Sequence, residues 1–160
     1  SDVVLDSTYK EYLFIFNNIH PETTDKNFTV NFSADSGSNY NVTKTTTFFR
    51  AYHGEDGTSA TLEYASGSDV AQGTGAQDLM NGIKNDNDGS GSGYLYLFNP
   101  SSTTFVKHFI SVTNIMQDNS QSFQAHIAGY CNTTSAVDAV QFAMSSGDID
   151  AGTIQLFGVN

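Results

Sequence analysis

Near its end the chain reads Ala136-Val-Asp-Ala-Val-Gln-Phe-Ala-Met-Ser-Ser-Gly-Asp-Ile-Asp-Ala-Gly-Thr-Ile-Gln-Leu-Phe-Gly-Val159, and this stretch contains two segments of alternating polarity. In the first segment Val140, Phe142 and Met144 alternate with small or polar residues, and in the second Ile and Leu alternate with Thr and Gln. A period of two residues places one set of side chains in the core and the other in water, as in a β-strand. Glycine and aspartate between the segments tolerate tight turns. The stretch therefore predicts two strands joined by a turn, the second an integral part of a sheet.

Similar alternation recurs along the rest of the chain. It marks further strands within residues 9–18, 27–33, 41–52, 61–64, 94–99, 104–114 and 122–131. Helices do not alternate with these strands, so the pattern predicts an all-β fold: an antiparallel β-sandwich, jelly-roll-like, with eight or nine strands. We expect the strands at 9–18 and 27–33 to pair as a hairpin.

The best candidate for a helix is the segment 75–84, where Leu79, Met80 and Ile83 recur at helical spacing. This short helix lies within residues 36–92, which are rich in Gly, Ser, Asn and Asp and which we interpret as a long, loop-rich insertion. Residues 1–8 are expected to form a short arm. Because the chain has 160 residues and no boundary in composition, we expect a single β-sandwich domain over residues 1–160.

The composition describes the core and excludes two classes of partner. The chain has 12 Phe and 8 Tyr but no Trp, so aromatic rings are expected to fill much of the core. It carries 17 Asp and Glu against 6 Lys and Arg, a formal net charge of −11. Phosphate backbones and anionic membranes bind clusters of Lys and Arg, which this sequence lacks. We therefore predict no nucleic-acid partner and no membrane partner.

The strands at 9–18 and 94–99 are apolar on both faces at their centres. In the first strand, Leu13 and Ile15 lie on the opposite side from three aromatic residues, and in the second strand Leu95 and Leu97 alternate with tyrosines. A strand with two apolar faces is covered on both sides. We therefore predict that these four residues lie in an interface, covered by a neighbouring subunit or by the insertion folded over them.

Residues that could carry chemistry occur in patterns that favour structural roles. The loop 86–91 offers carboxylate oxygens, which Ca²⁺ prefers, but it departs from the EF-hand spacing; a plain turn is favoured, and an ion site stays open. Asp148 and Asp150 are interpreted as turn-capping residues. The single Cys131 is interpreted as a buried thiol. The histidines lie in four separate segments, without a spacing typical of metal ligands: His20, His53, His108 and His126.

Four stretches of the sequence carry a resemblance to a known family. The chain opens with Tyr-x-x-Tyr-Leu-Phe-x-Phe-x-Asn-Ile-His-Pro at 9–21, followed by Phe-x-Val-x-Phe at 28–32. It later contains Gly93-Tyr-Leu-Tyr-Leu-Phe-Asn-Pro-Ser-Ser-Thr-Thr-Phe-Val-Lys107 and then the C-terminal stretch quoted above. Together these motifs resemble a domain of virion structural proteins of tailed bacteriophages, especially those of marine bacteria, found in head-decoration and in tail-fibre or appendage proteins. The resemblance covers most of the chain outside the insertion.

The resemblance implies a structural protein of the virion that is not an enzyme and needs no cofactor or metal. Its first form is a capsid decoration or cement protein, with the major capsid protein or other virion proteins as partners and a homo-oligomer, preferably a trimer, as its own state. The alternative is a tail-fibre or appendage domain that recognises host-surface glycans. Recognition would need exposed rings, and Tyr40, Tyr52 and Tyr64 near the insertion are the candidates.

Overall fold

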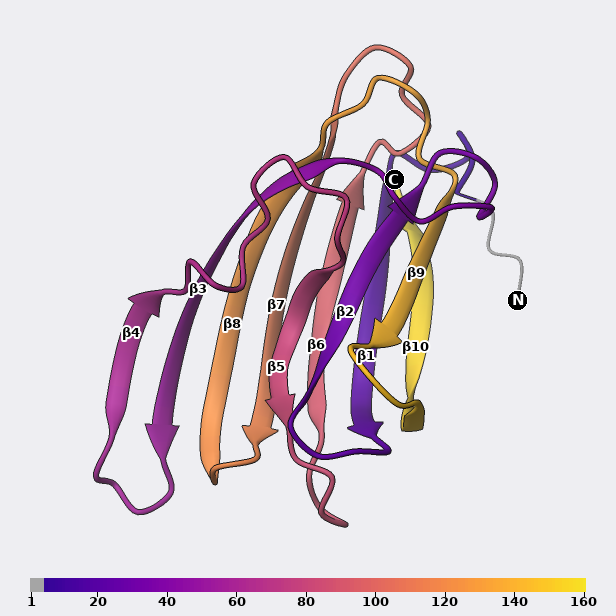
Figure 1. Cartoon of the computed structure of the whole chain (residues 1–160). Helices are drawn as coiled ribbons and strands as arrows, with labels where there is room; N and C mark the ends of the chain where they lie inside the picture. Colours follow the sequence, from indigo (N-terminus) through magenta and orange to yellow (C-terminus); the bar gives the residue numbers. More distant parts are fainter. Residues whose placement is uncertain (1–4) are drawn as a thin grey trace.

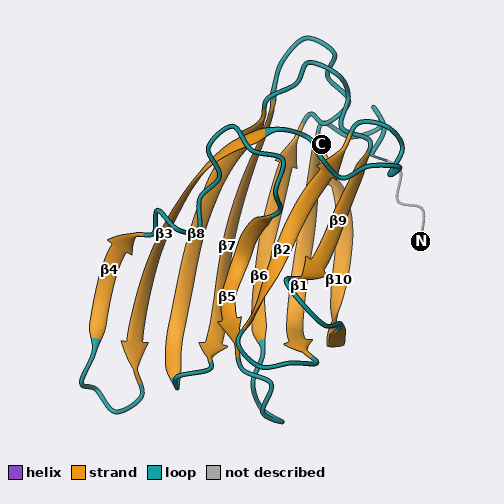
Figure 2. Cartoon of the chain, in the orientation of Figure 1, coloured by secondary structure: helices purple, strands orange, loops and turns teal. Residues whose placement is uncertain are grey.

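The computed structural model describes residues 5–160, and these residues form strands and loops without a helix (Figure 2). The strands are β1 (Glu11–Pro21), β2 (Lys26–Ser33), β3 (Lys44–Gly54), β4 (Ala60–Tyr64), β5 (Gln77–Ile83), β6 (Gly91–Phe98), β7 (Lys107–Gln117), β8 (Gln121–Cys131), β9 (Ala139–Met144) and β10 (Ile149–Val159). The first half of the predicted arm, residues 1–4, lies outside the described residues. In the described part of the chain there is no helix long and apolar enough to cross a membrane.

All neighbouring strands are antiparallel, and they form one open sheet that branches at β7. Seven strands in the order β10–β1–β6–β7–β8–β3–β4 make up what we call the broad sheet. The remaining strands, β5–β2–β9, are the three-stranded branch, joined to β7 through the pair Ile83 and Gln117. In Figure 1 this branch lies in front of β7, β6 and β1.

The core lies between the three-stranded branch and the broad sheet, and aromatic rings fill much of it, as predicted. The ring centroids of Phe16 in β1 and Phe28 in β2 are 5.1 Å apart, and so are those of Phe32 in β2 and Phe109 in β7. Aromatic pairs at such separations add to the stabilisation that burial provides. We call the face of the broad sheet that points toward this core the inner face, and the opposite one the outer face.

The predicted helix at 75–84 is wrong, because this segment contains strand β5. The pairing of β5 with β2 has two irregularities in register near Phe28. An irregularity of this kind shifts the side-chain alternation, so the adjacent Leu79 and Met80 are both fully buried. Gly82 has a φ of 68°, which a right-handed helix does not contain. The helix-like spacing of apolar residues therefore comes from a bulged strand.

The predicted hairpin between the first two strands is also wrong. β1 pairs with β10 and β6, whereas β2 pairs with β5 and β9. The connection after Pro21 thus carries the chain from the broad sheet to the three-stranded branch. The C-terminal stretch carries the chain back from the three-stranded branch to the broad sheet. Its two predicted strands are present, but they lie in different parts of the sheet, because β9 pairs with β2 and β10 pairs with β1. The local sequence pattern was thus enough to predict which segments form strands, but not which strands pair with each other.

The all-β, antiparallel class is confirmed, with ten strands in place of eight or nine. Residues 36–92 contribute β3, β4, β5 and the start of β6. β3 pairs along its whole length with β8, from Lys44 opposite Cys131 to Gly54 opposite Gln121, so this region is part of the broad sheet. The strand order does not confirm a jelly roll.

Candidate functional site

The outer face of the broad sheet is lined with apolar and aromatic side chains. Successive side chains of a strand point to opposite faces, so the neighbours of the buried Leu95, Leu97 and Phe109 point outward. Ile110 is 46% exposed on this face and Phe157 is 48% exposed. We define the outer-face patch as Leu13, Ile15, Phe49, Leu62, Tyr64, Tyr94, Tyr96, Phe98, Ile110, Val112, His126, Ala128 and Phe157.

The strand register arranges this patch in rows across the sheet. One row contains Phe157, Leu13, Tyr96, Ile110 and Ala128 on five successive strands. The next contains Ile15, Tyr94, Val112, His126, Phe49 and Tyr64. Neighbouring side chains in a row support one another; the rings of Phe49 and His126, for example, stack at 4.9 Å. The patch is therefore a continuous surface and not a scatter of exposed residues.

The outer face carries almost no formal charge. Within the regular ladders of the seven described strands, Glu11 at the margin is the only Asp, Glu, Lys or Arg at an outward-facing position. The chain as a whole has a net charge of −11. Nearly all of its carboxylates therefore lie on other surfaces, and the protein has one neutral, apolar face on an otherwise acidic molecule.

The four predicted interface residues fall on opposite faces of the sheet. Leu13 and Ile15 lie in the outer-face patch, whereas Leu95 and Leu97 are fully buried in the core, opposite Phe14 and Tyr12. This placement corrects the prediction for the two β6 leucines, because a residue of the core is not available to another chain. The outward residues of β6 are Tyr94, Tyr96 and Phe98. Sequence reasoning missed them, although the two apolar faces of 94–99 were the signal.

The three tyrosines predicted for recognition do not form one platform. Tyr64 is 54% exposed in the outer-face patch, and its hydroxyl donates a hydrogen bond to Asp69 Oδ2 at 2.5 Å. Tyr52 points to the inner face and packs against the core, with the Arg50 guanidinium 5.9 Å from its ring centroid. Tyr40 lies in the loop before β3, where its carbonyl accepts a hydrogen bond from Asn31. Of these three tyrosines, only Tyr64 therefore offers an exposed ring on the patch.

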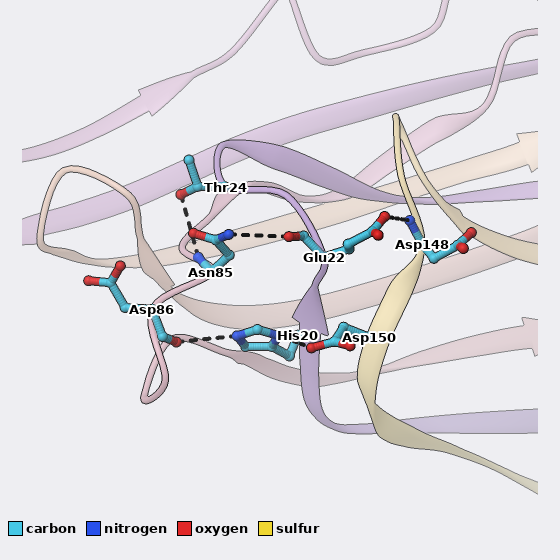
Figure 3. A network of polar contacts seen from close by, with 7 residues as sticks. All are labelled: His20, Glu22, Thr24, Asn85, Asp86, Asp148 and Asp150. Atoms are coloured by element: carbon cyan, nitrogen blue, oxygen red, sulfur yellow. Dashed lines mark hydrogen bonds and ion pairs between the residues drawn. The ribbon is translucent and has the colours of Figure 1, made fainter.

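A polar network, which we call the His20 corner, joins β1, the loop after β5 and the start of β10 (Figure 3). His20 Nδ1 lies 3.3 Å from Asp150 Oδ2, and His20 Nε2 lies 3.2 Å from the carbonyl oxygen of Asp86. Glu22 extends the network, because its carboxylate accepts a hydrogen bond from the Asp148 amide at 3.3 Å. Both neighbours of the imidazole are oxygen atoms that can accept hydrogen bonds.

The loop 86–91 is closed by its own hydrogen bonds. The Gly89 amide donates to the Asp86 carbonyl at 2.8 Å, and the Asp86 carboxylate pairs with Lys84 Nζ at 2.9 Å. Over residues 5–160, no group of three or more His, Cys, Asp or Glu side chains is placed to hold a metal ion. His53 lies at the end of β3, and His108 and His126 lie on the outer face of β7 and β8, away from the His20 corner.

Two lysines and the single cysteine are buried next to one another on the inner face. Lys44 in β3, Cys131 in β8 and Lys107 in β7 are neighbours in register, and all three are fully buried. Lys44 Nζ donates to the carbonyl of Gly75 at 2.7 Å, and Lys107 Nζ donates to the carbonyl of Thr133 at 3.1 Å. The ammonium groups therefore hold loops onto the end of the broad sheet.

The electrostatics of these buried groups support a structural role. Burial lowers the pKa of Lys44 to about 8 and also lowers the pKa of Lys107. Burial raises the pKa of Cys131 to about 12, although the positive charges of Lys44 and Lys107 act to lower it. A thiol with a raised pKa is protonated at neutral pH, whereas a reactive cysteine is a thiolate. Cys131 is thus a buried packing residue, as its sequence context predicted.

A shallow, open depression of about 320 Å³ lies at one end of the outer face, beside the turn between β7 and β8. Its lining includes His53, Glu55, Asn114, Met116 and Gln121. Ligand pockets usually enclose most of their ligand, and this depression is open to solvent on one side. It extends the outer-face patch with polar side chains and does not by itself define a ligand.

Comparison of the chain with protein-family models, with curated proteins and with solved structures finds no match. The molecule is thus defined by its own features: an acidic, antiparallel all-β domain with one neutral and apolar sheet face. The outer-face patch is the candidate functional site.

Proposed function

We propose that this chain is a non-enzymatic structural protein of a virion, with decoration or cementing of a bacteriophage head as its first role. The motifs at 9–21, 28–32 and 93–107 support the family, and the outer-face patch is the observation that carries the function. An acidic surface keeps a protein soluble and discourages non-specific contacts. A large, neutral apolar face is typical of a surface that is buried on assembly. This division of the surface suits a building block of a particle.

The finer description of the fold belongs to the same proposal. We infer that the three-stranded branch and the broad sheet pack as a β-sandwich, and the contacts of Phe16 with Phe28 and of Phe32 with Phe109 support this. A jelly roll has eight strands in two Greek keys. The division of this chain into seven strands and three strands differs from that pattern, so jelly-roll connectivity is not part of the proposal.

The second candidate is a tail-fibre or appendage domain that recognises host-surface glycans. It is favoured by the exposed rings of Phe49, Tyr64 and Tyr94, because aromatic faces pack well against sugars. Cell binding by Tyr64→Ala and Tyr40→Ala variants tests it, with Phe105→Ala as a matched control, since Phe105 is exposed in a loop off the sheet. A loss confined to the tyrosine variants supports recognition, and unchanged binding supports a purely architectural role.

The copy number of the protein in purified virions tests the first candidate. Quantitative mass spectrometry against the major capsid protein is expected to give hundreds of copies, as a protein bound across the capsid lattice requires. A handful of copies, in multiples of three or six, would place the chain on the tail and make glycan recognition the better function. Absence of the protein from washed virions would overturn both.

A further inference from the structure

The outer-face patch is a continuous apolar surface of a size that is often functional in soluble proteins. The two complete rows of the patch lie about 6.8 Å apart on strands about 4.8 Å apart, and they cover roughly 400 Å² in projection. Phe98 and Leu62 extend the patch, and polar side chains border it, among them Asn17, Ser92, Asn114 and Gln124. Monomeric soluble proteins rarely expose a contiguous apolar patch larger than a few hundred Å². The accessible area of such a textured face exceeds its projection, and a stable interface needs about 800 Å² per partner. The patch and the polar side chains that border it therefore have the apolar centre and polar rim of a protein interface.

The charge distribution indicates which partner fits it. Every copy of this chain carries a net charge of −11, so two copies that meet through their other surfaces bring carboxylates together. Like charges placed opposite each other disfavour an interface. The outer-face patch largely avoids this cost, because the carboxylates next to it, Glu11, Glu55 and Asp69, lie at its margins. It is the face through which one acidic copy can approach another.

The side chains at the centre of the patch favour protein over carbohydrate. Ile110 and Val112 occupy the middle strand, and Leu13 and Ile15 lie two strands away. These branched aliphatic side chains have no flat face on which a sugar ring can stack, but they interdigitate well with the same residues of another sheet. The patch is also as wide as the whole broad sheet, far wider than a single glycan chain.

We propose that the outer-face patch packs against the same patch of a second copy, across a two-fold axis near Ile110. A patch overlaps most fully with itself when the axis passes through its centre, and β7 is the middle strand of the seven. With the axis along β7, Ile110 meets the partner's Ile110, and Tyr96 lies opposite the partner's Ala128, since β6 and β8 flank β7. The two sheets would lie about 10 Å apart, with their strands nearly aligned.

This dimer sharpens the homo-oligomer that the sequence resemblance implies, but it does not depend on the virion assignment. It replaces the predicted trimer, because a three-fold assembly joins two different patches of each chain, whereas a single self-complementary face closes a two-fold pair. Self-association is measured on the purified protein and copy number on the virion, so the two proposals can fail separately.

Sedimentation equilibrium of the purified chain is the first test. The wild-type protein is expected to be a dimer at about 100 µM, and Ile110→Glu is expected to weaken the dimer at least about 100-fold, because two carboxylates would meet at the axis. Phe105→Glu is the matched control: it also places a carboxylate at an exposed apolar residue, but in the loop between β6 and β7. Circular dichroism shows whether each variant is folded. A monomeric or trimeric wild type, or an Ile110→Glu variant that dimerises normally, overturns the proposal.

A cross-link locates the axis and does not depend on weakening the dimer. Ile110→Cys places two thiols across the two-fold axis, and because sheets about 10 Å apart are beyond disulfide reach, a bifunctional maleimide of matching span is used, which adds to both thiols. Wild type should not cross-link, because its single cysteine, Cys131, is buried. Efficient covalent dimers of Ile110→Cys, but not of Phe105→Cys, are expected. No cross-link at Ile110→Cys in a protein that sediments as a dimer would place the interface elsewhere and overturn the face-to-face arrangement.

Discussion

The inner and outer faces of the broad sheet carry charge in the reverse of the usual order. The buried inner face holds Lys44 and Lys107, whereas the solvent-facing outer-face patch holds no lysine or arginine at all. Lysine is almost never fully buried without partners. Here the ammonium groups reach loop carbonyls at the end of the sheet. The lysines in this fold therefore lie where hydrogen-bond acceptors are available. The outer face has the apolar composition that is typical of a buried surface.

Substitutions at Phe109 and Ile110 test most directly how differently the two faces contribute to stability, because these residues are adjacent in β7 and point to opposite sides. Phe109 is fully buried, so Phe109→Ala should lower the free energy of unfolding by about 3–5 kcal/mol. Ile110→Ala should lower it by less than about 1 kcal/mol at concentrations where the chain is monomeric. Urea unfolding followed by circular dichroism gives both values. Equal losses would mean that the outer face is part of the monomer's core.

Lys44→Ala tests whether the buried lysine stabilises the inner face. The change leaves a cavity and removes the hydrogen bond to the Gly75 carbonyl, and it should cost about 2–3 kcal/mol. Lys44→Met keeps the aliphatic volume and should cost less. The exposed Lys10→Ala is the control, with an expected change within about 0.5 kcal/mol. A stabilised Lys44→Ala protein would show that the burial of the charge outweighs its hydrogen bonds.

The lowered pKa of Lys44 predicts a dependence of stability on pH. The folded chain loses this proton near pH 8, whereas the unfolded chain keeps it to about its ordinary pKa of 10.5. The unfolded state therefore binds more protons in this range, and the free energy of unfolding rises with pH, by on the order of 1 kcal/mol between pH 7 and 9. Above pH 9 the raised pKa of Cys131 acts in the opposite direction. Urea titrations at each pH measure this effect, and the free energy of unfolding of Lys44→Met should not rise with pH in this range. An equal rise in Lys44→Met would show that other titratable groups cause it.

The smallest effect on the free energy of unfolding is expected at the His20 corner, where the charged side chain of Asp150 is exposed to solvent. The Asp150 side chain is 61% exposed, and exposed ion pairs contribute between about 0 and 1 kcal/mol. Asp150→Asn should therefore change the free energy of unfolding by less than about 1 kcal/mol, and by still less at high salt, which screens such pairs. Thermal unfolding at low and high salt measures this. A larger loss that salt does not reduce would show that Asp150 orders the start of β10 by more than its charge.

The strands could be predicted because their evidence is local. Alternation within 27–33 or 104–114 reports a half-buried surface wherever the partner strand lies. The helix prediction at 75–84 failed because the bulge near Phe28, which buries both Leu79 and Met80, depends on the pairing of β5 with β2. The hairpin prediction failed because the turn after Pro21 carries the chain from the broad sheet to the three-stranded branch. The residues of that turn do not indicate this change.

The candidate site divides along the same line. Local patterns were enough to specify an acidic, antiparallel all-β chain with an aromatic core, and to mark β1 and β6 as strands with two apolar faces. Only the packed structure decides that Leu95 and Leu97 face inward while Tyr94 and Tyr96 face outward. Both pairs are apolar enough for a core, so the choice depends on which face the three-stranded branch covers. That cover is made by strands distant in sequence, and its position is a property of the whole fold.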